Sequence, residues 1–146
     1  MNSAAILQAQ DNAAKRSFDI LQPAGWPKPK GYSNGILAQG RMVFVGGQIG
    51  WNERGEFAAD FTGQVRQALA NIVAVLKEGG AAPGDLVRLT WYVVDMEEYL
   101  GALAAIGRVY REIIGGHYPT MALVQIVRLV EPDARVEIEA TAVLPA

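Results

Sequence analysis

A strictly alternating run near the C-terminus restricts the folds that this chain can adopt. Between residues 135 and 141, every second side chain is apolar. A period of two predicts a β-strand with one buried face and one polar face. The apolar positions are Val136, Ile138 and Ala140, and the polar positions are Arg135, Glu137, Glu139 and Thr141. The polar face carries two carboxylates, which need either water, a cationic partner or a chemical role.

Turn residues separate two pairs of predicted strands. An apolar run from Met121 to Leu129 precedes the alternating strand, with a Glu-Pro-Asp turn between them. The stretch His117–Val143 therefore predicts two strands joined by a short polar turn. Nearer the N-terminus, Gly35–Ala38 and Met42–Val45 flank a Gln-Gly pair, which predicts a β-hairpin. The following Gly46-Gly47 pair indicates a bulge or a close approach of the backbone to another group.

Two segments have the apolar spacing of amphipathic helices. The first runs from about Phe61 to Glu78, and the second from about Met96 to Ile114. Each is closed by a double glycine and followed by a strand, the first of which spans Leu86–Val94. Helix, double glycine and strand thus occur twice. This order predicts an α+β fold with both helices packed on one face of a sheet.

Proline spacing divides the chain into an arm and a domain. Pro23, Pro27 and Pro29 interrupt the region before residue 31, so residues 1–30 predict an N-terminal extension or arm. Residues 31–146 then form a single domain, long enough to bury a core.

Composition excludes several classes of function. A net charge of −2 and a pI near 5.4 argue against binding of nucleic acid, which needs clustered Lys and Arg. The chain has no cysteine and one histidine, so we expect no metal site, and no phosphate-loop spacing indicates a cofactor. Its N-terminus has no apolar run of membrane-spanning length. We therefore expect a cytoplasmic protein without a membrane partner.

Two helices cover only one face of a sheet, yet several predicted strands are apolar on both faces. The strands concerned are Met42–Val45, Leu89–Val94 and Leu123–Val127. An uncovered apolar face of that size is unusual for a monomer. We expect it to pack against other subunits.

Several motifs, in order, resemble the RidA (YjgF/L-PSP) family. They are Gly47-Gln48-Ile49, the helix Gln64–Glu78, Tyr118-Pro119, Arg128-Leu129 and Val136-Glu137-Ile138-Glu139-Ala140. The resemblance covers roughly Tyr32 to Leu144. It implies a mixed six-stranded sheet with two helices on one face, of the RidA and chorismate-mutase-like type. It also implies a homotrimer with ligand clefts between subunits.

The resemblance assigns roles to three groups of residues. Glu137 takes the place of the glutamate that positions a water molecule, and Tyr32 that of the cleft tyrosine. Gly47 and Gln48 match the ligand-binding loop. For Glu137, an inter-subunit salt bridge is an equally good interpretation, and Tyr32 is equally well read as an interface aromatic.

Four family positions differ in this chain. Met121 stands where the family's deaminases have the arginine that grips the substrate carboxylate. Gly46, Ala104 and Leu123 also differ from the family pattern. We expect Met121 to line an apolar pocket wall.

Two further residues are candidate ligand contacts. His117 precedes the Tyr-Pro pair and is expected near the cleft rim, although a lone histidine is more often a surface residue. Arg128 is read first as structural and second as a substitute anion contact.

Two functions remain open. The protein binds or hydrolyses a small enamine, imine or related metabolite, with 2-imino acid deamination in doubt because of Met121. Alternatively, it is a non-catalytic small-ligand-binding or chaperone-like trimer. Ribonuclease activity is disfavoured by the acidic pI and the single histidine.

Overall fold

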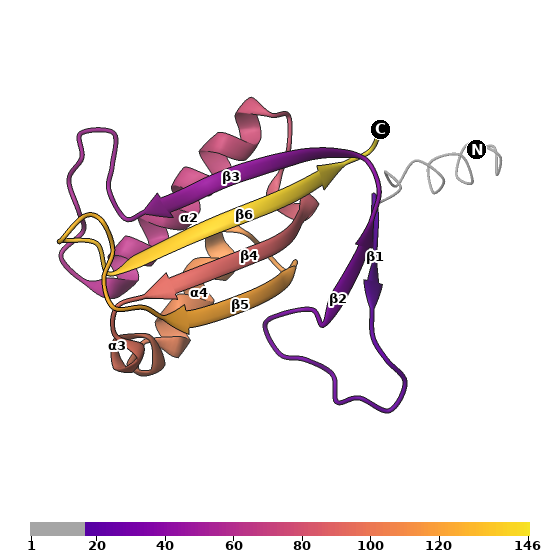
Figure 1. Ribbon diagram of the computed structural model, residues 1–146, viewed down its shortest axis with the longest axis horizontal. Helices are drawn as coiled ribbons and strands as arrows, with labels where there is room; N and C mark the ends of the chain where they lie inside the picture. Colours follow the sequence, from indigo (N-terminus) through magenta and orange to yellow (C-terminus); the bar gives the residue numbers. More distant parts are fainter. Residues whose placement is uncertain (1–16) are drawn as a thin grey trace, which may run out of the picture.

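Four strands form the sheet on which the protein's core is built. In the computed structural model, which describes residues 17–146, they lie in the order β3-β6-β4-β5 (Figure 1). Their bounds are β3 (Arg41–Ile49), β4 (Leu86–Val93), β5 (Thr120–Gln125) and β6 (Val136–Leu144). β6 is antiparallel to both β3 and β4, and β4 is parallel to β5. β1 (Phe18–Leu21) and β2 (Gly35–Ala38) pair antiparallel as a separate two-stranded sheet.

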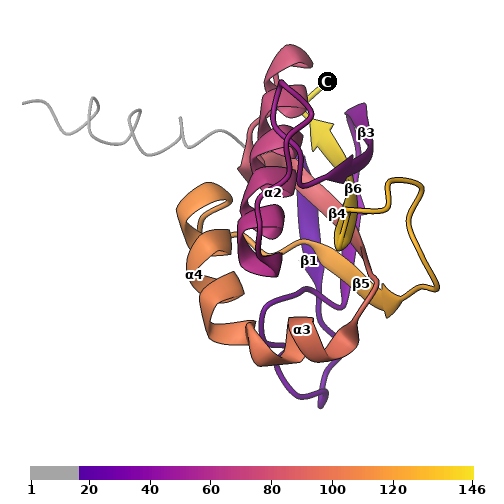
Figure 2. The same cartoon turned by 90° about the vertical axis from the view of Figure 1, so that its left-hand side faces the viewer.

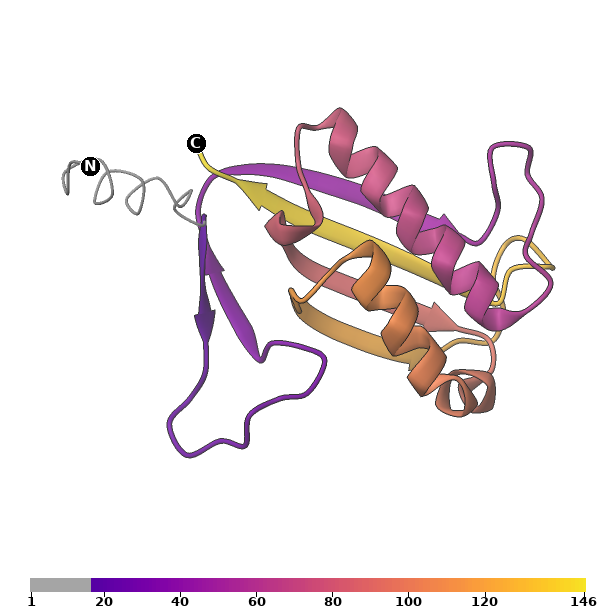
Figure 3. The same ribbon diagram turned by 180° about the vertical axis from the view of Figure 1, so that it is seen from behind.

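The helices lie together on one face of the four-stranded sheet (Figures 2 and 3). They are α2 (Phe61–Glu78), α3 (Met96–Gly101) and α4 (Leu103–Ile113), with a short 3-10 turn at Pro83–Asp85 before β4. The predicted first helix is confirmed residue for residue, and the Asp60 side chain caps it by accepting from the Gly63 amide at 3.2 Å. The α+β class is confirmed as well. Within residues 17–146, no helix is long and apolar enough to span a membrane.

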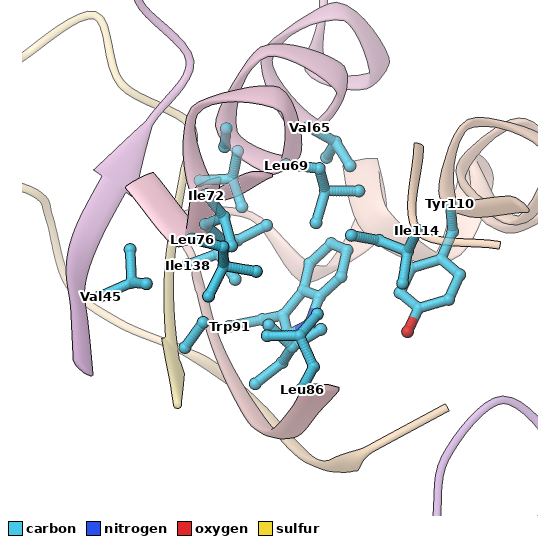
Figure 4. Close-up of a cluster of buried hydrophobic side chains, with 14 of the residues drawn as sticks. Val45, Val65, Leu69, Ile72, Leu76, Leu86, Trp91, Tyr110, Ile114 and Ile138 are labelled. Atoms are coloured by element: carbon cyan, nitrogen blue, oxygen red, sulfur yellow. The ribbon is translucent and has the colours of Figure 1, made fainter. Parts of the chain in front are cut away.

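Alternation along β6 explains why this strand is central. Its even-numbered side chains, from Val136 to Leu144, are buried against the helices. Leu69, Ile72 and Leu76 of α2 are fully buried, and Figure 4 shows them packed beside Ile138 of β6 and Trp91 of β4. Burying each such side chain contributes about 1.5–3 kcal/mol, so this layer holds helix and sheet together.

The predicted pairing of β2 with β3 is wrong. β2 turns away and pairs with β1, while β3 pairs along its length with β6. Gly40, at the bend between them, has φ +150° and lies against the backbone carbonyl of Leu144, where a Cβ has no room. The Gln-Gly pair therefore makes a bend rather than a hairpin turn, and the six strands form two sheets instead of one six-stranded sheet.

The two C-terminal strands are not neighbours either. β4 lies between β5 and β6, so the connection over residues 126–135 crosses the end of β4 rather than closing a short turn. A parallel neighbour for β4 requires a long crossover, which α3 and α4 supply. The predicted helix Met96–Ile114 is also interrupted, because Ala102 (φ −112°, ψ 9°) leaves the helical conformation after Gly101.

Candidate functional site

A cavity of about 500 Å³ opens between the helix layer and β5. Its side chains come from β4, β5, α3, α4 and the segment just before β2. The lining residues are Lys30, Gly31, Tyr32, Trp91, Tyr99, Leu103, Ile106, Gly107, Tyr110, Arg111, Tyr118, Met121 and Leu123. The wall is thus mostly aromatic and aliphatic, with a few polar groups, as in most small-molecule sites.

Two hydrogen bonds of the next residue, Ser33, hold Tyr32 at this cavity. The amide of Ser33 donates to Pro119 O at 3.0 Å, and its hydroxyl donates to Tyr118 O at 2.5 Å. Gly31 precedes this anchor with φ +78°, a left-handed conformation that glycine adopts without strain. Tyr32 itself is 45 % exposed. The Tyr-Pro motif and Tyr32, far apart in the sequence, therefore meet at one wall.

Two stacked tyrosines form part of the cavity wall. The rings of Tyr110 and Tyr118 lie 5.2 Å apart and nearly parallel, and the Tyr110 hydroxyl donates to His117 O at 2.7 Å. Burial raises the pKa of Tyr110 well above its ordinary value, because a phenolate there would lose its hydration. Tyr110 therefore stays protonated and acts as a fixed donor rather than a base.

Trp91 lines the cavity and also belongs to the buried core cluster shown in Figure 4. Its side chain is 4 % exposed, and its indole Nε1 has no acceptor among the described residues. An unsatisfied buried donor costs about 1–3 kcal/mol. It is the one buried side-chain polar atom in residues 17–146 without a partner.

Glu137 lies on the opposite face of the sheet from this cavity. On β6 it alternates with buried Val136 and Ile138, so it points to the face that carries no helices. Its carboxylate rests over Gly47, where an added Cβ would overlap Oε1 and lie 2.7 Å from Cδ. A Cβ added at the neighbouring Gly46 would meet no atom within 4 Å. The predicted close approach at the glycine pair is therefore one between Gly47 and Glu137.

The glycine loop is a β-bulge. The register between β3 and β6 shifts between Val45 and Gln48, as the glycine pair predicted. The side-chain amide of Gln48 donates to Gly46 O at 3.2 Å. The bulge accommodates an extra residue and presents Gly47 beneath the Glu137 carboxylate.

A second carboxylate shares the open face. Glu139 accepts a hydrogen bond from the Tyr92 hydroxyl at 2.9 Å. This bond raises the pKa of Tyr92 above its ordinary value, since ionised Tyr92 would face Glu139. A hollow of about 360 Å³ beside it is lined by Phe44, Val45, Gly46, Arg88, Thr90, Glu139, Ala140 and Thr141.

His117 and Arg128 lie outside the cavity near Met121. The His117 Nε2 contacts Leu86 O at 2.6 Å, and its ring packs on Phe18 at 5.4 Å. Since a carbonyl only accepts, Nε2 carries a proton and ties β4 to the segment before β5. Arg128 is exposed in the connection after β5. The structure gives His117 a structural contact and leaves Arg128 at the surface.

The predicted site residues thus form two separate groups in one chain. Tyr32 and Met121 line the cavity on the helix side, whereas Gly47, Gln48 and Glu137 belong to the open side or its edge. Glu137 pairs with Tyr92, and Tyr92 with Val124, so β4 separates the two groups. Two strand spacings place β6 about 10 Å from β5. Met121 lies three residues from Val124 along β5, so the two groups are further apart than this and on opposite faces.

Sequence reasoning missed the helical wall of the cavity. Leu103, Gly107 and Arg111 recur every four residues on α4, which places them on one helix face. That spacing was a usable signal, but it does not indicate that this face borders a cavity. Across residues 17–146, no group of three His, Cys, Asp or Glu side chains is placed to hold a metal ion.

Comparisons with known proteins find one family of relatives for this chain. The profile of the endoribonuclease L-PSP family matches residues 27–144. The 2-iminobutanoate/2-iminopropanoate deaminase of Escherichia coli K12 is 34 % identical over 108 residues, which cover 71 % of this chain and 80 % of the relative.

Two solved structures are similar along most of the chain. YyfB of Yersinia pestis, a protein of the conserved Rid family, has a TM-score of 0.78 at 32 % identity and covers 88 % of this chain and 99 % of its own. Escherichia coli TdcF, solved with bound serine, has a TM-score of 0.62 at 35 % identity, covering 86 % and 98 %.

Proposed function

Because the chain belongs to the endoribonuclease L-PSP (RidA/YjgF) family, we propose that it hydrolyses a small imine or enamine in clefts between the subunits of a homotrimer. The observation that carries this proposal is the seating of the Glu137 carboxylate over Gly47. A deaminase relative and a serine-bound relative support a small nitrogen-containing ligand.

The proposed chemistry needs one water molecule and one base. Glu137 orients a water molecule and accepts its proton as the oxygen attacks the imine carbon. The resulting carbinolamine takes this proton from Glu137 on its nitrogen. The C–N bond then breaks as the Glu137 carboxylate accepts the hydroxyl proton, which releases ammonia and leaves a carbonyl compound. Because Gly47 has no side chain, the Glu137 carboxylate can lie directly over the backbone of β3, where it is placed to orient the attacking water.

A cleft between subunits accounts for the two separated groups of residues. One chain presents Tyr32 and Met121 at the β5 edge, and Glu137 on the open face near the β3 edge. A cyclic assembly brings the β5 edge of one subunit to the open face of the next. Exposed apolar side chains on this face support such contact: Met42 is 55 % exposed and Phe44 71 %. Sedimentation velocity is expected to give a trimer, and a monomer at micromolar concentration would contradict the shared cleft.

The replacement Met121→Arg tests the reaction against the non-catalytic alternative. An amino-acid oxidase generates 2-imino acids in the assay, and loss of the trapped imine is followed with each protein. We expect wild-type hydrolysis above background, and higher rates for small imino acids with Met121→Arg, whose guanidinium can bind a carboxylate. If neither protein accelerates hydrolysis, the catalytic proposal is wrong. The apolar Met121 wall then favours the non-catalytic ligand-binding trimer.

The replacement Gly47→Ala is expected to lower hydrolysis with little loss of stability. The new Cβ overlaps the Glu137 carboxylate, which is the flexible end of a side chain and moves aside. We expect kcat to fall by about tenfold or more as the water is misplaced. Gly46→Ala is the matched control, since a Cβ there meets nothing within 4 Å. Equal kcat values for Gly47→Ala and Gly46→Ala would show that the position of the Glu137 carboxylate does not affect the reaction.

A further inference from the structure

We propose that the cavity between α4 and β5 selects a carboxylate with a bulky aromatic or branched body, and that Arg111 at its mouth binds the carboxylate. The inference rests on the proposed function only in taking this cavity as the substrate half of the cleft. It assigns to Arg111 the anion contact that Met121 cannot make.

The size and wall of the cavity indicate a bulky body. About 500 Å³ lies in the range of pockets that enclose drug-sized ligands, far above the need of a three- or four-carbon acid. Aromatic rings of Tyr99, Trp91 and Tyr118 border it, together with Leu103 and Leu123. Such surfaces bind a ring or a branched chain by burial and stacking. The Met121 thioether makes favourable contacts with aromatic rings, and it does so without a charge.

The charge at the cavity has one sign. Among residues 17–146, Lys30 and Arg111 are the only charged residues that line it and no carboxylate does, although the whole chain carries a net charge of −2. Both cations are exposed at the mouth. An apolar interior with a cationic rim matches a ligand that has an apolar body and an anionic end.

Arg111 lies against Gly107 on the helix surface that borders the cavity. The two residues are one turn apart on α4, and Nη1 of Arg111 lies 3.6 Å from the position of a Cβ on Gly107. The guanidinium therefore lies back along the helix over the glycine. A glycine inside a helix costs about 0.5–1 kcal/mol relative to alanine. Gly107 has no positive φ that would require glycine, and a Cβ there would make only an ordinary contact with Arg111.

Arg111 is also unengaged within residues 17–146. Its neighbour Glu112 pairs instead with Arg66 at 2.8 Å, and Arg135 pairs with Glu98. No ion pair or side-chain hydrogen bond of the described part of the chain involves Arg111. Its donors are thus available to a carboxylate, which a guanidinium can bind through two parallel hydrogen bonds.

The test is calorimetric titration of the purified protein with three probes. They are 3-phenylpropanoate, propanoate, which lacks the ring, and 3-phenylpropan-1-ol, which lacks the charge. We expect 3-phenylpropanoate to bind tighter than both others. Arg111→Ala is expected to weaken 3-phenylpropanoate binding about tenfold and to leave 3-phenylpropan-1-ol unchanged.

Two controls locate the effect. Arg108→Ala removes an exposed arginine of the same helix that does not line the cavity, and it should change neither affinity. Gly107→Leu places a side chain at the mouth and should weaken both aromatic probes. The inference is overturned if Arg111→Ala binds 3-phenylpropanoate like the wild type, or if propanoate binds as tightly as 3-phenylpropanoate.

Hydrolysis of the imines of phenylalanine and alanine separates this inference from the proposed function. A higher KM for the phenylalanine imine in Arg111→Ala supports both. Loss of 3-phenylpropanoate binding in Arg111→Ala, with no turnover by the wild type, leaves the inference standing and ends the catalytic proposal. Wild-type turnover with an unchanged KM in Arg111→Ala overturns the inference alone.

Discussion

Replacing Glu137 with glutamine is expected to lower the kcat for imine hydrolysis by about 100-fold, the usual contribution of a general base. Glutamine has nearly the same shape and fits over Gly47, but its amide cannot take a proton from water. Glu137 is partly exposed on the open face, so the folded state should lose little stability. Stopped-flow or trapped-imine assays give kcat, and thermal unfolding checks the fold.

Glu139→Gln is the matched control for this change. Glu139 lies two residues further along the same face of β6, and its carboxylate accepts the Tyr92 hydroxyl. Its replacement should leave kcat within a few-fold of the wild type. An equal loss of kcat in both variants would indicate an effect of the overall charge of the open face and would contradict the role proposed for Glu137.

Mixed trimers test whether Glu137 acts on a neighbouring subunit's cavity. Glu137→Gln and Tyr32→Ala damage the two separate halves of the proposed cleft. If each cleft combines neighbours, unfolding and refolding the two inactive variants together at equal amounts should restore roughly one quarter of the wild-type rate. No recovery would show that both groups act within one chain or not at all.

Replacing Gln64 with leucine is expected to lower the free energy of unfolding by about 3 kcal/mol. Gln64 is 2 % exposed, and its amide donates to Ala58 O at 3.2 Å and Asp133 O at 3.0 Å. Its carbonyl accepts the Arg135 amide at 2.8 Å. Leucine fills the same volume but leaves these partly buried backbone groups without their Gln64 partner, each at a cost of about 1 kcal/mol. Urea unfolding measures the loss.

Close contact between α2 and the segment that follows β3 prevents the helix from shifting to compensate for the lost hydrogen bonds. A Cβ on Gly50 would lie 2.5 Å from Cα of Gln64, so strand end and helix already touch there. Gln67→Leu, one turn further along α2, is the control. Within the described residues its side-chain amide donates only to Asn71 Oδ1, at 2.8 Å, so the replacement should cost less than about 1 kcal/mol. Equal losses would mean that the amide network of Gln64 contributes no specific stability.

Local elements of this protein were predictable because local patterns determine them. The Asp60 cap and the double glycine that begins at Gly79 set the two ends of α2, and the alternation along β6 correctly indicated which side chains are buried. The glycine pair correctly indicated a bulge. The family, too, was identifiable from motifs that lie close together in the chain, and the comparisons confirm it.

Spatial neighbours were less predictable, because turn residues show where a strand ends but not which strand it joins. β5 and β6 are consecutive in sequence, yet β4 pairs between them, and β2 pairs with β1 instead of β3. Burial of β4 on its helix-facing side and the helical crossover favour the central position. Both effects depend on how the whole sheet packs, so they cannot be read from a short stretch of sequence.

By itself, the sequence determined the class of fold, the family, the main helix and the residues placed at the glycine loop and the Tyr-Pro motif. Only the tertiary structure decided that Glu137 and Met121 point to opposite faces of the sheet. It also decided that α4 supplies the cavity with Gly107 and Arg111. The physical reason is that periodicity sets the face of an element on which a side chain lies, whereas packing of distant elements sets what that face meets.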